Sequence, residues 1–226
     1  MKCVARIRSA FSSKFGIPRQ AGLVQELKAR VILEPEFRSP EALRGIEGFS
    51  HLWLIWEFSQ NKRDSWSPTV RPPRLGGNVR MGVFATRSPF RPNPIGLSCV
   101  RLDRVEWDGP EGPVLHVSGA DLMDGTPIYD IKPYVPYTDC HPDAAEGFAP
   151  ADTSRLLKVE IPEEMLVHIP EEDRAALRGV LEQDPRPAYQ RDPERVYGFG
   201  FAGMEVRFTV RNGVLQVVGV SPEQPQ

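Results

Sequence analysis

The sequence is poor in the residues that most often bind metals. Its 226 residues include three cysteines, Cys3, Cys99 and Cys140, and four histidines. The cysteines are far apart and form no Cys-x-x-Cys pair, and the histidines lack the close spacing of metal ligands. Neither a disulfide framework nor a zinc site is expected, and we predict a protein without a bound metal.

Long apolar runs are also missing. No segment approaches the roughly 18 apolar residues that suggest a membrane span. Residues 1–8 alternate charged and apolar side chains and do not form the apolar region of a secretory signal. These absences predict a cytoplasmic protein with no place in a membrane.

Proline is the residue in excess, with 23 copies. Because proline fixes φ and removes a hydrogen-bond donor, helices cannot run through much of this chain. Alternation of apolar and polar residues indicates half-buried strands, and short apolar runs indicate buried ones. We predict a buried central strand at 49–58 and further strands at 4–8, 29–33, 79–86, 96–107, 114–118 and 128–135. A βαβ alternation is missing here, which argues against a doubly wound parallel sheet.

The composition changes near residue 138. Residues 138–152 are small, polar and rich in proline and alanine, as in a linker. Beyond them, Pro170 and the acids after it predict a helix start, and Ala176 to Leu181 supply its apolar face. Strands are expected near 156–161, 196–202, 204–210 and 214–220. We therefore predict a β-rich domain at 1–138 and a small α+β domain at 139–226.

One motif is misleading. Residues 198–203 read Gly-Phe-Gly-Phe-Ala-Gly and match G-x-G-x-x-G. Nucleotide binding by this motif requires a helix directly after it. Residues 204–210 alternate like a strand instead, so nucleotide binding at this site is not expected.

The charge is unevenly distributed although the net charge is only −2. Residues 71–101 hold six arginines and no acid, whereas residues 139–195 hold fourteen acids against seven bases. Within the basic stretch, prolines stiffen the loops that display Arg87, Ser88, Arg91 and Asn93. The pattern favours a localised anion-binding face, and the alternative is a rigid loop with solvated arginines.

Three further segments are open to two interpretations. The acids of Asp121–Pro127 are placed to accept hydrogen bonds from a ribose or an amino group, or they form an ordinary Asp-Gly turn. His51 is either a hydrogen-bonded core residue or a catalytic one. Residues 183–189, with an Asp, an Arg and a Tyr, suit RNA recognition or a contact between domains.

Together these segments resemble the tRNA-methyltransferase O family, the TsaA/YaeB-like proteins. The resemblance rests on segments 14–20, 48–53, 71–78, 82–96, 122–127, 130–134 and 183–189, in the family's order. It implies a single-sheeted antiparallel β-barrel that binds S-adenosylmethionine, a small C-terminal domain and a homodimer. The implied reaction methylates N6 of threonylcarbamoyladenosine at position 37 of threonine tRNA.

The resemblance also implies site residues. The cofactor contacts carried over are Pro18, Arg19, Gln20, Phe58, Ser59, Arg87, Leu97, Asp121, Leu122, Met123 and Asp124. The residues predicted to hold the anticodon stem-loop are Arg71, Arg74, Arg91, Asn93, Lys132, Arg186 and Tyr189. The acceptor nitrogen must lose a proton, and Asp124 and Asp130 are the candidates to receive it. Two other functions stay open: a non-catalytic RNA-binding module, and a methyltransferase of the same fold that acts on a small molecule.

Overall fold

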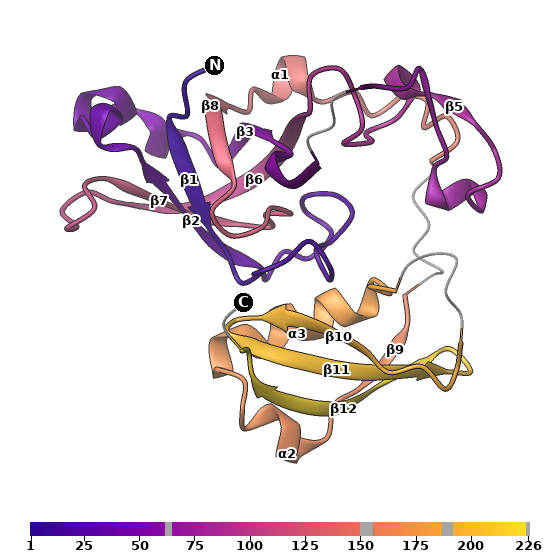
Figure 1. Cartoon of the computed structure of the whole chain (residues 1–226). Helices are drawn as coiled ribbons and strands as arrows, with labels where there is room; N and C mark the ends of the chain where they lie inside the picture. The colour runs from indigo at the N-terminus through magenta and orange to yellow at the C-terminus, as the bar shows by residue number, and fades with distance from the viewer. Residues whose placement is uncertain (62–64, 150–155, 187–191, 225–226) are drawn as a thin grey trace.

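The computed structural model describes residues 1–61, 65–149, 156–186 and 192–224. Six strands form a closed barrel in the first part of the chain (Figure 1). They are β1 (Ala5–Arg8), β2 (Lys28–Leu33), β3 (His51–Glu57), β6 (Ile95–Glu106), β7 (Val114–Ser118) and β8 (Pro127–Pro133). The order β1-β2-β7-β6-β3-β8 returns to β1, and every pairing is antiparallel. The predicted mainly β fold with an antiparallel barrel is confirmed.

Strand β3 shows how the sequence produces this wall. Its inward residues Leu52, Leu54 and Trp56 are buried, whereas Trp53 and Ile55 point outward and are half-buried. The prediction of a fully buried strand at 49–58 is therefore wrong for one face. A barrel wall has only one face toward the core, so side chains alternate along each strand.

A long segment between β3 and β6 leaves the barrel wall. Within it, β4 (Thr69–Val70) pairs with β5 (Met81–Gly82), and we call residues 65–94 the arm. Figure 1 shows the arm projecting away from the barrel. The strand predicted at 79–86 is reduced to β5 and the 3-10 helix η6 (Val83–Ala85), because among the described residues it pairs only with the two-residue β4. Two more 3-10 turns lie in this segment, η4 (Ser59–Asn61) and η5 (Pro73–Leu75).

The connection from β2 to β3 consists of short 3-10 turns, η1 (Pro35–Phe37), η2 (Pro40–Leu43) and η3 (Ile46–Gly48). Turn η2 begins at Pro40, after Ser39 at its N-cap, and ends at Leu43. Gly45 has a φ of +85°, which a continuing helix cannot accommodate.

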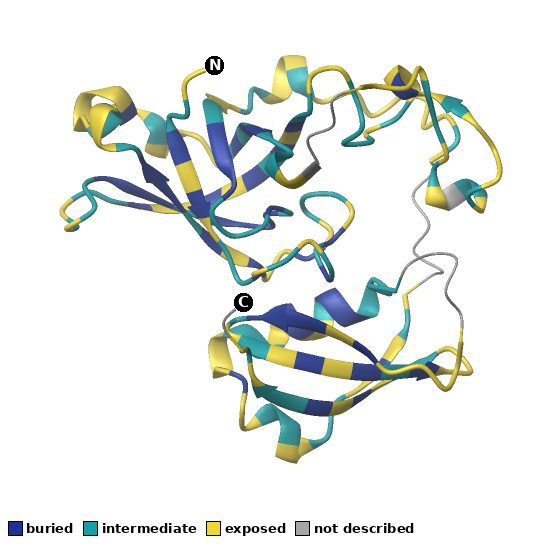
Figure 2. Cartoon of the chain, viewed as in Figure 1, coloured by how far each residue is buried: buried dark blue, intermediate teal, exposed yellow. Residues whose placement is uncertain are grey.

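The C-terminal elements form a four-stranded sheet with one long helix. After α1 (Pro136–Asp139), the sheet has the order β10-β11-β12-β9, with β9 parallel to β12. Its elements are β9 (Lys158–Glu160), α2 (Glu163–Leu166), α3 (Glu171–Glu182), β10 (Tyr197–Phe201), β11 (Met204–Arg211) and β12 (Val214–Pro222). The predicted helix and four strands are confirmed, and the buried and exposed bands along β11 are visible in Figure 2.

The Gly-rich motif lies in this sheet. Strand β10 ends at Phe201, and Ala202 and Gly203 form a tight turn with φ of 51° and 76°. Strand β11 follows, so no helix N-terminus faces the glycines. The strand predicted after residues 198–203 is present, in place of the helix that a Rossmann motif requires.

The N-terminal loop after β1 packs into the core beneath this sheet. Phe11, Val24 and Leu27 belong to the same buried cluster as Leu177 and Phe199. Gly16 has a φ of +92°, and a Cβ there would lie 2.3 Å from the Phe199 ring. The backbone N–H of Ala202 also donates to the carbonyl of Ala10 over 2.8 Å. The C-terminal sheet therefore helps to fix the loop that carries Pro18, Arg19 and Gln20.

Among the residues described, no helix has the length and apolarity required to span a membrane.

Candidate active site

Three loops from distant parts of the sequence meet at one end of the barrel. They follow β1, precede β6 and follow β7. The Arg87 guanidinium donates a hydrogen bond to the side-chain oxygen of Gln20, which joins the first two loops. The backbone N–H of Ala21 donates to the Asp121 carboxylate, which joins the first and third. The structure thus brings together Gln20, Arg87 and Asp121, which were predicted to contact the same cofactor.

Asp121 is held by Ser98, which lies at an inward position of strand β6. Ser98 is buried, and its hydroxyl donates to the Asp121 carboxylate over 2.5 Å. The indole Nε1 of buried Trp56 donates in turn to the Ser98 oxygen over 2.9 Å. Neither Ser98 nor Trp56 was among the predicted site residues. The available signal was a serine at an inward position of an otherwise apolar alternating strand.

Burial raises the pKa of the Asp121 carboxyl above its ordinary value. The hydrogen bonds from Ser98 and from the backbone N–H groups of Asp121 and Ala21 oppose that rise, as does the positive charge of Arg87. A carboxylate in such surroundings is a strong partner for a cationic ligand, because the interaction is weakly screened by water.

Apolar groups lie close to this network. The Phe58 ring lies 4.3 Å from that of Trp56, centroid to centroid, and the Phe58 N–H donates to the Pro94 carbonyl over 2.8 Å. Ser59 follows directly, in η4, and is half-buried. Phe58 and Ser59 thereby lie against the end of the proline-rich loop that carries Arg87.

Leu97 projects from the outer face of β6 and is 51% exposed. In the register of the sheet it pairs with Ile55, and Ile55 pairs with Asp130 of β8 on its other side. A hollow of about 350 Å³ on this face is lined by Leu97, Ile55 and Lys132, among others. The Lys132 ammonium lies 2.9 Å from the Asp130 carboxylate. Leu97, Asp130 and Lys132 therefore share one outer face of the barrel.

Other predicted cofactor contacts are placed differently. Pro18 is buried, and so is Leu122, which belongs to the barrel core. Arg19 is exposed and Met123 is half-buried. Both carboxylate oxygens of Asp124 are engaged, one by the Ser9 N–H over 3.0 Å and one by Arg8 over 3.2 Å. Asp124 thus ties the end of β1 to the loop after β7.

Besides Lys132, the predicted RNA-binding residues differ in how free their side chains are to bind a ligand. Arg71 and Asn93 are exposed on the arm. Arg91 instead braces its own loop by donating to the Thr86 carbonyl over 2.8 Å. Arg186 uses its guanidinium on the Asp184 carboxylate of the same turn, over 2.8 and 2.9 Å. Tyr189 and the side chain of Arg74 lie outside the described residues.

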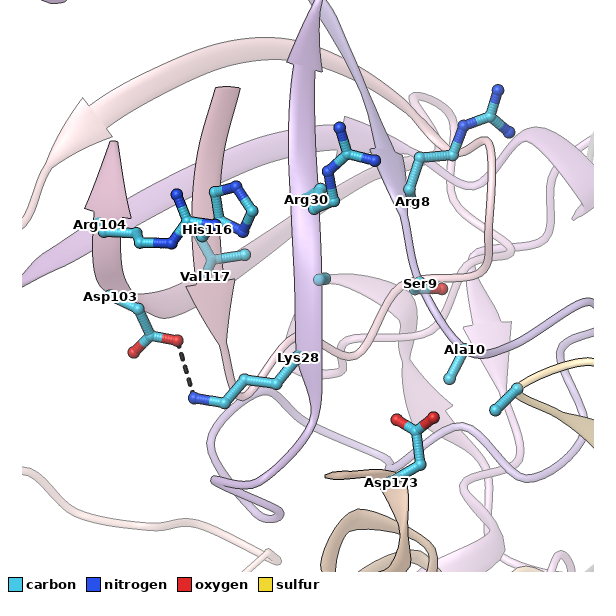
Figure 3. Close-up of a pocket in the computed structure, with 12 residues that line it drawn as sticks. Arg8, Ser9, Ala10, Lys28, Arg30, Asp103, Arg104, His116, Val117 and Asp173 are labelled. Atoms are coloured by element: carbon cyan, nitrogen blue, oxygen red, sulfur yellow. Dashed lines mark hydrogen bonds and ion pairs between the residues drawn. The ribbon is translucent and has the colours of Figure 1, made fainter. Parts of the chain in front are cut away.

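A larger cleft, of about 700 Å³, lies along the outer wall of β1, β2, β7 and β6 and reaches α3 (Figure 3). Its cations are paired with acids: Arg8 lies 3.2 Å from Asp124, and Lys28 lies 2.9 Å from Asp103. Arg30 likewise contacts Glu111 over 2.5 Å. Because the charges are balanced, this cleft offers a ligand no excess of positive charge. Within the described part of the chain, no cluster of His, Cys, Asp or Glu has the arrangement of a metal site.

Comparison with known proteins identifies relatives along the whole chain. Residues 6–140 match the tRNA-methyltransferase O N-terminal domain, and residues 154–223 match the TrmO C-terminal domain. The chain is 42% identical over 224 residues to the tRNA (adenine(37)-N6)-methyltransferase of Escherichia coli (strain K12), with 96% of this chain and 95% of that one covered. It is 44% identical over 213 residues to a Pseudomonas aeruginosa protein named putative S-adenosylmethionine-dependent methyltransferase RcsF, with 91% and 90% covered.

Solved structures agree with these matches. The crystal structure of TrmO from Pseudomonas aeruginosa superposes with a TM-score of 0.76 at 36% identity, covering 98% of this chain and 99% of that one. Fold and sequence together define a methyltransferase of the tRNA-modifying class that is built on a β-barrel. The chain belongs to the tRNA-methyltransferase O family. The predicted family and enzyme class are confirmed.

Proposed function

We propose that this protein transfers a methyl group from S-adenosylmethionine to N6 of threonylcarbamoyladenosine at position 37 of threonine tRNA. The relative from Escherichia coli is named for methylation of adenine 37 at N6, and the Pseudomonas aeruginosa relative for dependence on S-adenosylmethionine. The observation that carries the proposal is the convergence of Gln20, Arg87 and Asp121 at one barrel end.

The side chains present fit such a cofactor. S-adenosylmethionine carries an amino group and a sulfonium centre, both cationic, next to a ribose and a flat base. The Asp121 carboxylate suits the cationic groups or the ribose hydroxyls, and Arg87 suits a carboxylate. Phe58 and Leu97 offer apolar surface for the base. When bound, the cofactor supplies an electrophilic methyl group. The protein's contribution is then mainly alignment, which can supply much of the acceleration in a displacement reaction.

The acceptor nitrogen must lose a proton, and Asp130 is the better placed of the two predicted acids. It lies two strands from Leu97 in one row across the sheet, which corresponds to roughly 10 Å. Its side chain is 46% exposed. Both oxygens of Asp130 have local partners, the Ile131 N–H and the Lys132 ammonium, each over 2.9 Å. The oxygens of Asp124 instead tie two separate loops together. Asp130 accepts this proton, and Lys132 beside it contacts the RNA.

The anticodon stem-loop binds the arginine-bearing arm through its phosphates, with Arg71, Arg74 and Asn93 as contacts. The arm and the barrel then hold the target adenine outside its stack, which single-stranded RNA loops permit. A homodimer in the cytoplasm, with a division into domains at 1–138 and 139–226, completes the proposal.

The deciding experiment uses isotopically labelled S-adenosylmethionine and two pools of total tRNA, from cells with and without threonylcarbamoylation. The label should enter tRNA of the first pool alone and should be found, after digestion, in a methylated threonylcarbamoyladenosine. Label in both pools would rule out the modified base as substrate, and the absence of label from both pools would rule out the reaction.

The two other functions predict different results. A non-catalytic RNA-binding module would bind tRNA with steep salt dependence and would not bind S-adenosylmethionine. A small-molecule methyltransferase would retain full turnover when Arg71 and Arg74 are both replaced by alanine. Under our proposal this double variant binds tRNA weakly and shows a shallower dependence of affinity on salt.

A further inference from the structure

Two large aromatic side chains stand exposed on the arm. Trp66 and Phe84 are 53% and 74% exposed. Their ring centroids are 6.4 Å apart, with an angle of 32° between the ring planes. Single exposed apolar residues are common on protein surfaces. Two aromatic rings that contact each other and still leave most of their surface to solvent form a flat apolar surface available to a partner.

The loop around Phe84 is anchored. Its neighbour Val83 is buried, and the Val83 N–H donates to the Pro68 carbonyl over 2.9 Å. The guanidinium of Arg91 lies 6.0 Å from the centre of the Phe84 ring. Arg91 is itself fixed by its hydrogen bond to the Thr86 carbonyl. The Phe84 ring is therefore presented by a braced loop, which lowers the entropic cost of binding.

The charge around the rings indicates the kind of partner. The arm, residues 65–94, carries five arginines and no acid. An apolar protein surface would not require this excess of positive charge, whereas single-stranded nucleic acid combines flat bases with negative phosphates. Aromatic rings beside basic residues are the recurrent means of binding unstacked bases.

The rings also lie near the candidate active site. Phe84 precedes Arg87 by three residues, a chain length of at most about 11 Å, and Arg87 donates to Gln20 of the cofactor loop. A base stacked on Phe84 is therefore held close to the place where we locate the methyl donor.

We propose that Trp66 and Phe84 form a stacking platform for one base of the anticodon loop that neighbours the target adenine. The two rings are positioning residues: they fix the RNA so that the adenine reaches the donor. This inference rests on the proposed function, because it assumes that the RNA is the anticodon loop.

The test is a double-mutant cycle that combines protein variants with RNA variants. The protein variants are Phe84→Ala, Trp66→Ala and the control Tyr137→Ala, which removes an aromatic ring that is 92% exposed on α1. The RNAs are anticodon stem-loops in which one nucleotide beside position 37 at a time is made abasic. Binding is followed by fluorescence anisotropy at fixed salt, and S-adenosylmethionine binding by calorimetry.

We expect Phe84→Ala to weaken binding of the intact stem-loop by about 5- to 150-fold. One abasic RNA should bind the unmodified protein equally weakly, and Phe84→Ala should add nothing to that loss. Tyr137→Ala should bind like the unmodified protein, and cofactor affinity and the salt dependence should stay unchanged in Phe84→Ala, because stacking involves no phosphate.

Two outcomes would overturn the platform. Independent, multiplicative losses from Phe84→Ala and every abasic RNA would show that the ring contacts no base. A change from dimer to monomer in Phe84→Ala, measured by sedimentation, would show that a second copy of the chain covers the rings. Failure of the platform leaves labelling of tRNA intact, whereas failure of the proposed function abolishes labelling even in the unmodified protein.

Discussion

The Ser98 hydroxyl donates to the Asp121 carboxylate over 2.5 Å and so places a charged group at the edge of an apolar barrel. Trp56 fixes the Ser98 oxygen from inside the barrel. The carboxylate is held where desolvation disfavours its charge, since burial raises its pKa. Such an arrangement costs folding free energy and is typical of groups kept for binding or catalysis.

Replacing Asp121 by asparagine should separate stability from function. Asparagine keeps a carbonyl oxygen to accept from Ser98 but removes the charge. The loss of a charge-assisted contact should weaken S-adenosylmethionine binding by about 10- to 150-fold, corresponding to about 1.5–3 kcal/mol. Calorimetric titration with the cofactor measures this. Equal affinity in Asp121→Asn would exclude Asp121 from the cofactor site.

The stability of Asp121→Asn relative to the unmodified protein should depend on pH. The folded-state pKa of Asp121 is raised, so its carboxylate destabilises the fold at neutral pH and this cost disappears as the pH falls through the folded pKa toward the ordinary carboxyl range. Asp121→Asn should therefore unfold at a temperature equal to or higher than the unmodified protein at neutral pH, and the difference should narrow in acid. A difference that grows in acid would mean that the folded-state pKa is lowered.

Gly96→Ala tests the support behind this carboxylate. Gly96 pairs with Trp56 across β3 and β6, and a Cβ at Gly96 would lie 2.3 Å from the indole ring. Displacing the buried indole should cost about 1–3 kcal/mol of stability and should weaken cofactor binding through Ser98. Gly48→Ala is the control, since its Cβ meets open space. Thermal unfolding compares the two, and equal unfolding temperatures would show that the indole can move without cost.

The sequence predicts the strands of the barrel better than it predicts the contacts that hold Asp121 in place. Alternation along 4–8 and 96–107 reflects a local rule, one face to the core and one to solvent, and β1 and most of β6 follow it. The pairing of Gly96 with Trp56 depends on register between strands distant in sequence, which no local pattern encodes. The Trp56–Ser98–Asp121 chain of hydrogen bonds was missed for this reason.

In the arm, the local pattern predicts a longer strand than the structure contains. Residues 79–86 have the apolar content of a strand, yet only Val83 among them is buried. A strand persists when neighbours pair with it along its length, and β4 offers only two residues. Asp124 illustrates a third limit: its residue type suits a proton acceptor, whereas its bonds to Arg8 and Ser9 appear only in the folded chain.

Tyr129 provides a prediction in alkaline solution. Its hydroxyl donates to the Glu57 carboxylate, and this hydrogen bond raises the pKa of Tyr129 to about 12. The neutral phenol is favoured in the folded state, so the stabilisation is complete below the ordinary tyrosine pKa and is lost as the pH rises toward 12. Ultraviolet titration of tyrosinate should show a late-ionising group that is absent in Tyr129→Phe. Retention of that group in Tyr129→Phe would assign it to another tyrosine.

Two substitutions can show whether Asp124 fixes the loops or accepts the proton. Asparagine keeps a side-chain oxygen at this position, and alanine does not. Asp124→Ala leaves the Ser9 N–H without its acceptor and should cost about 1–3 kcal/mol, a fall in melting temperature of about 2–12 °C for a chain of this size. Asp124→Asn keeps an oxygen for Ser9 and loses only the exposed ion pair with Arg8, so it should melt near the unmodified protein. We expect Asp124→Asn also to retain methyl transfer, because the geometry gives Asp124 a loop-fixing role. A folded Asp124→Asn variant whose turnover falls by about 10²- to 10⁴-fold, as the loss of a general base requires, would instead establish Asp124 as the proton acceptor and displace Asp130 from that role.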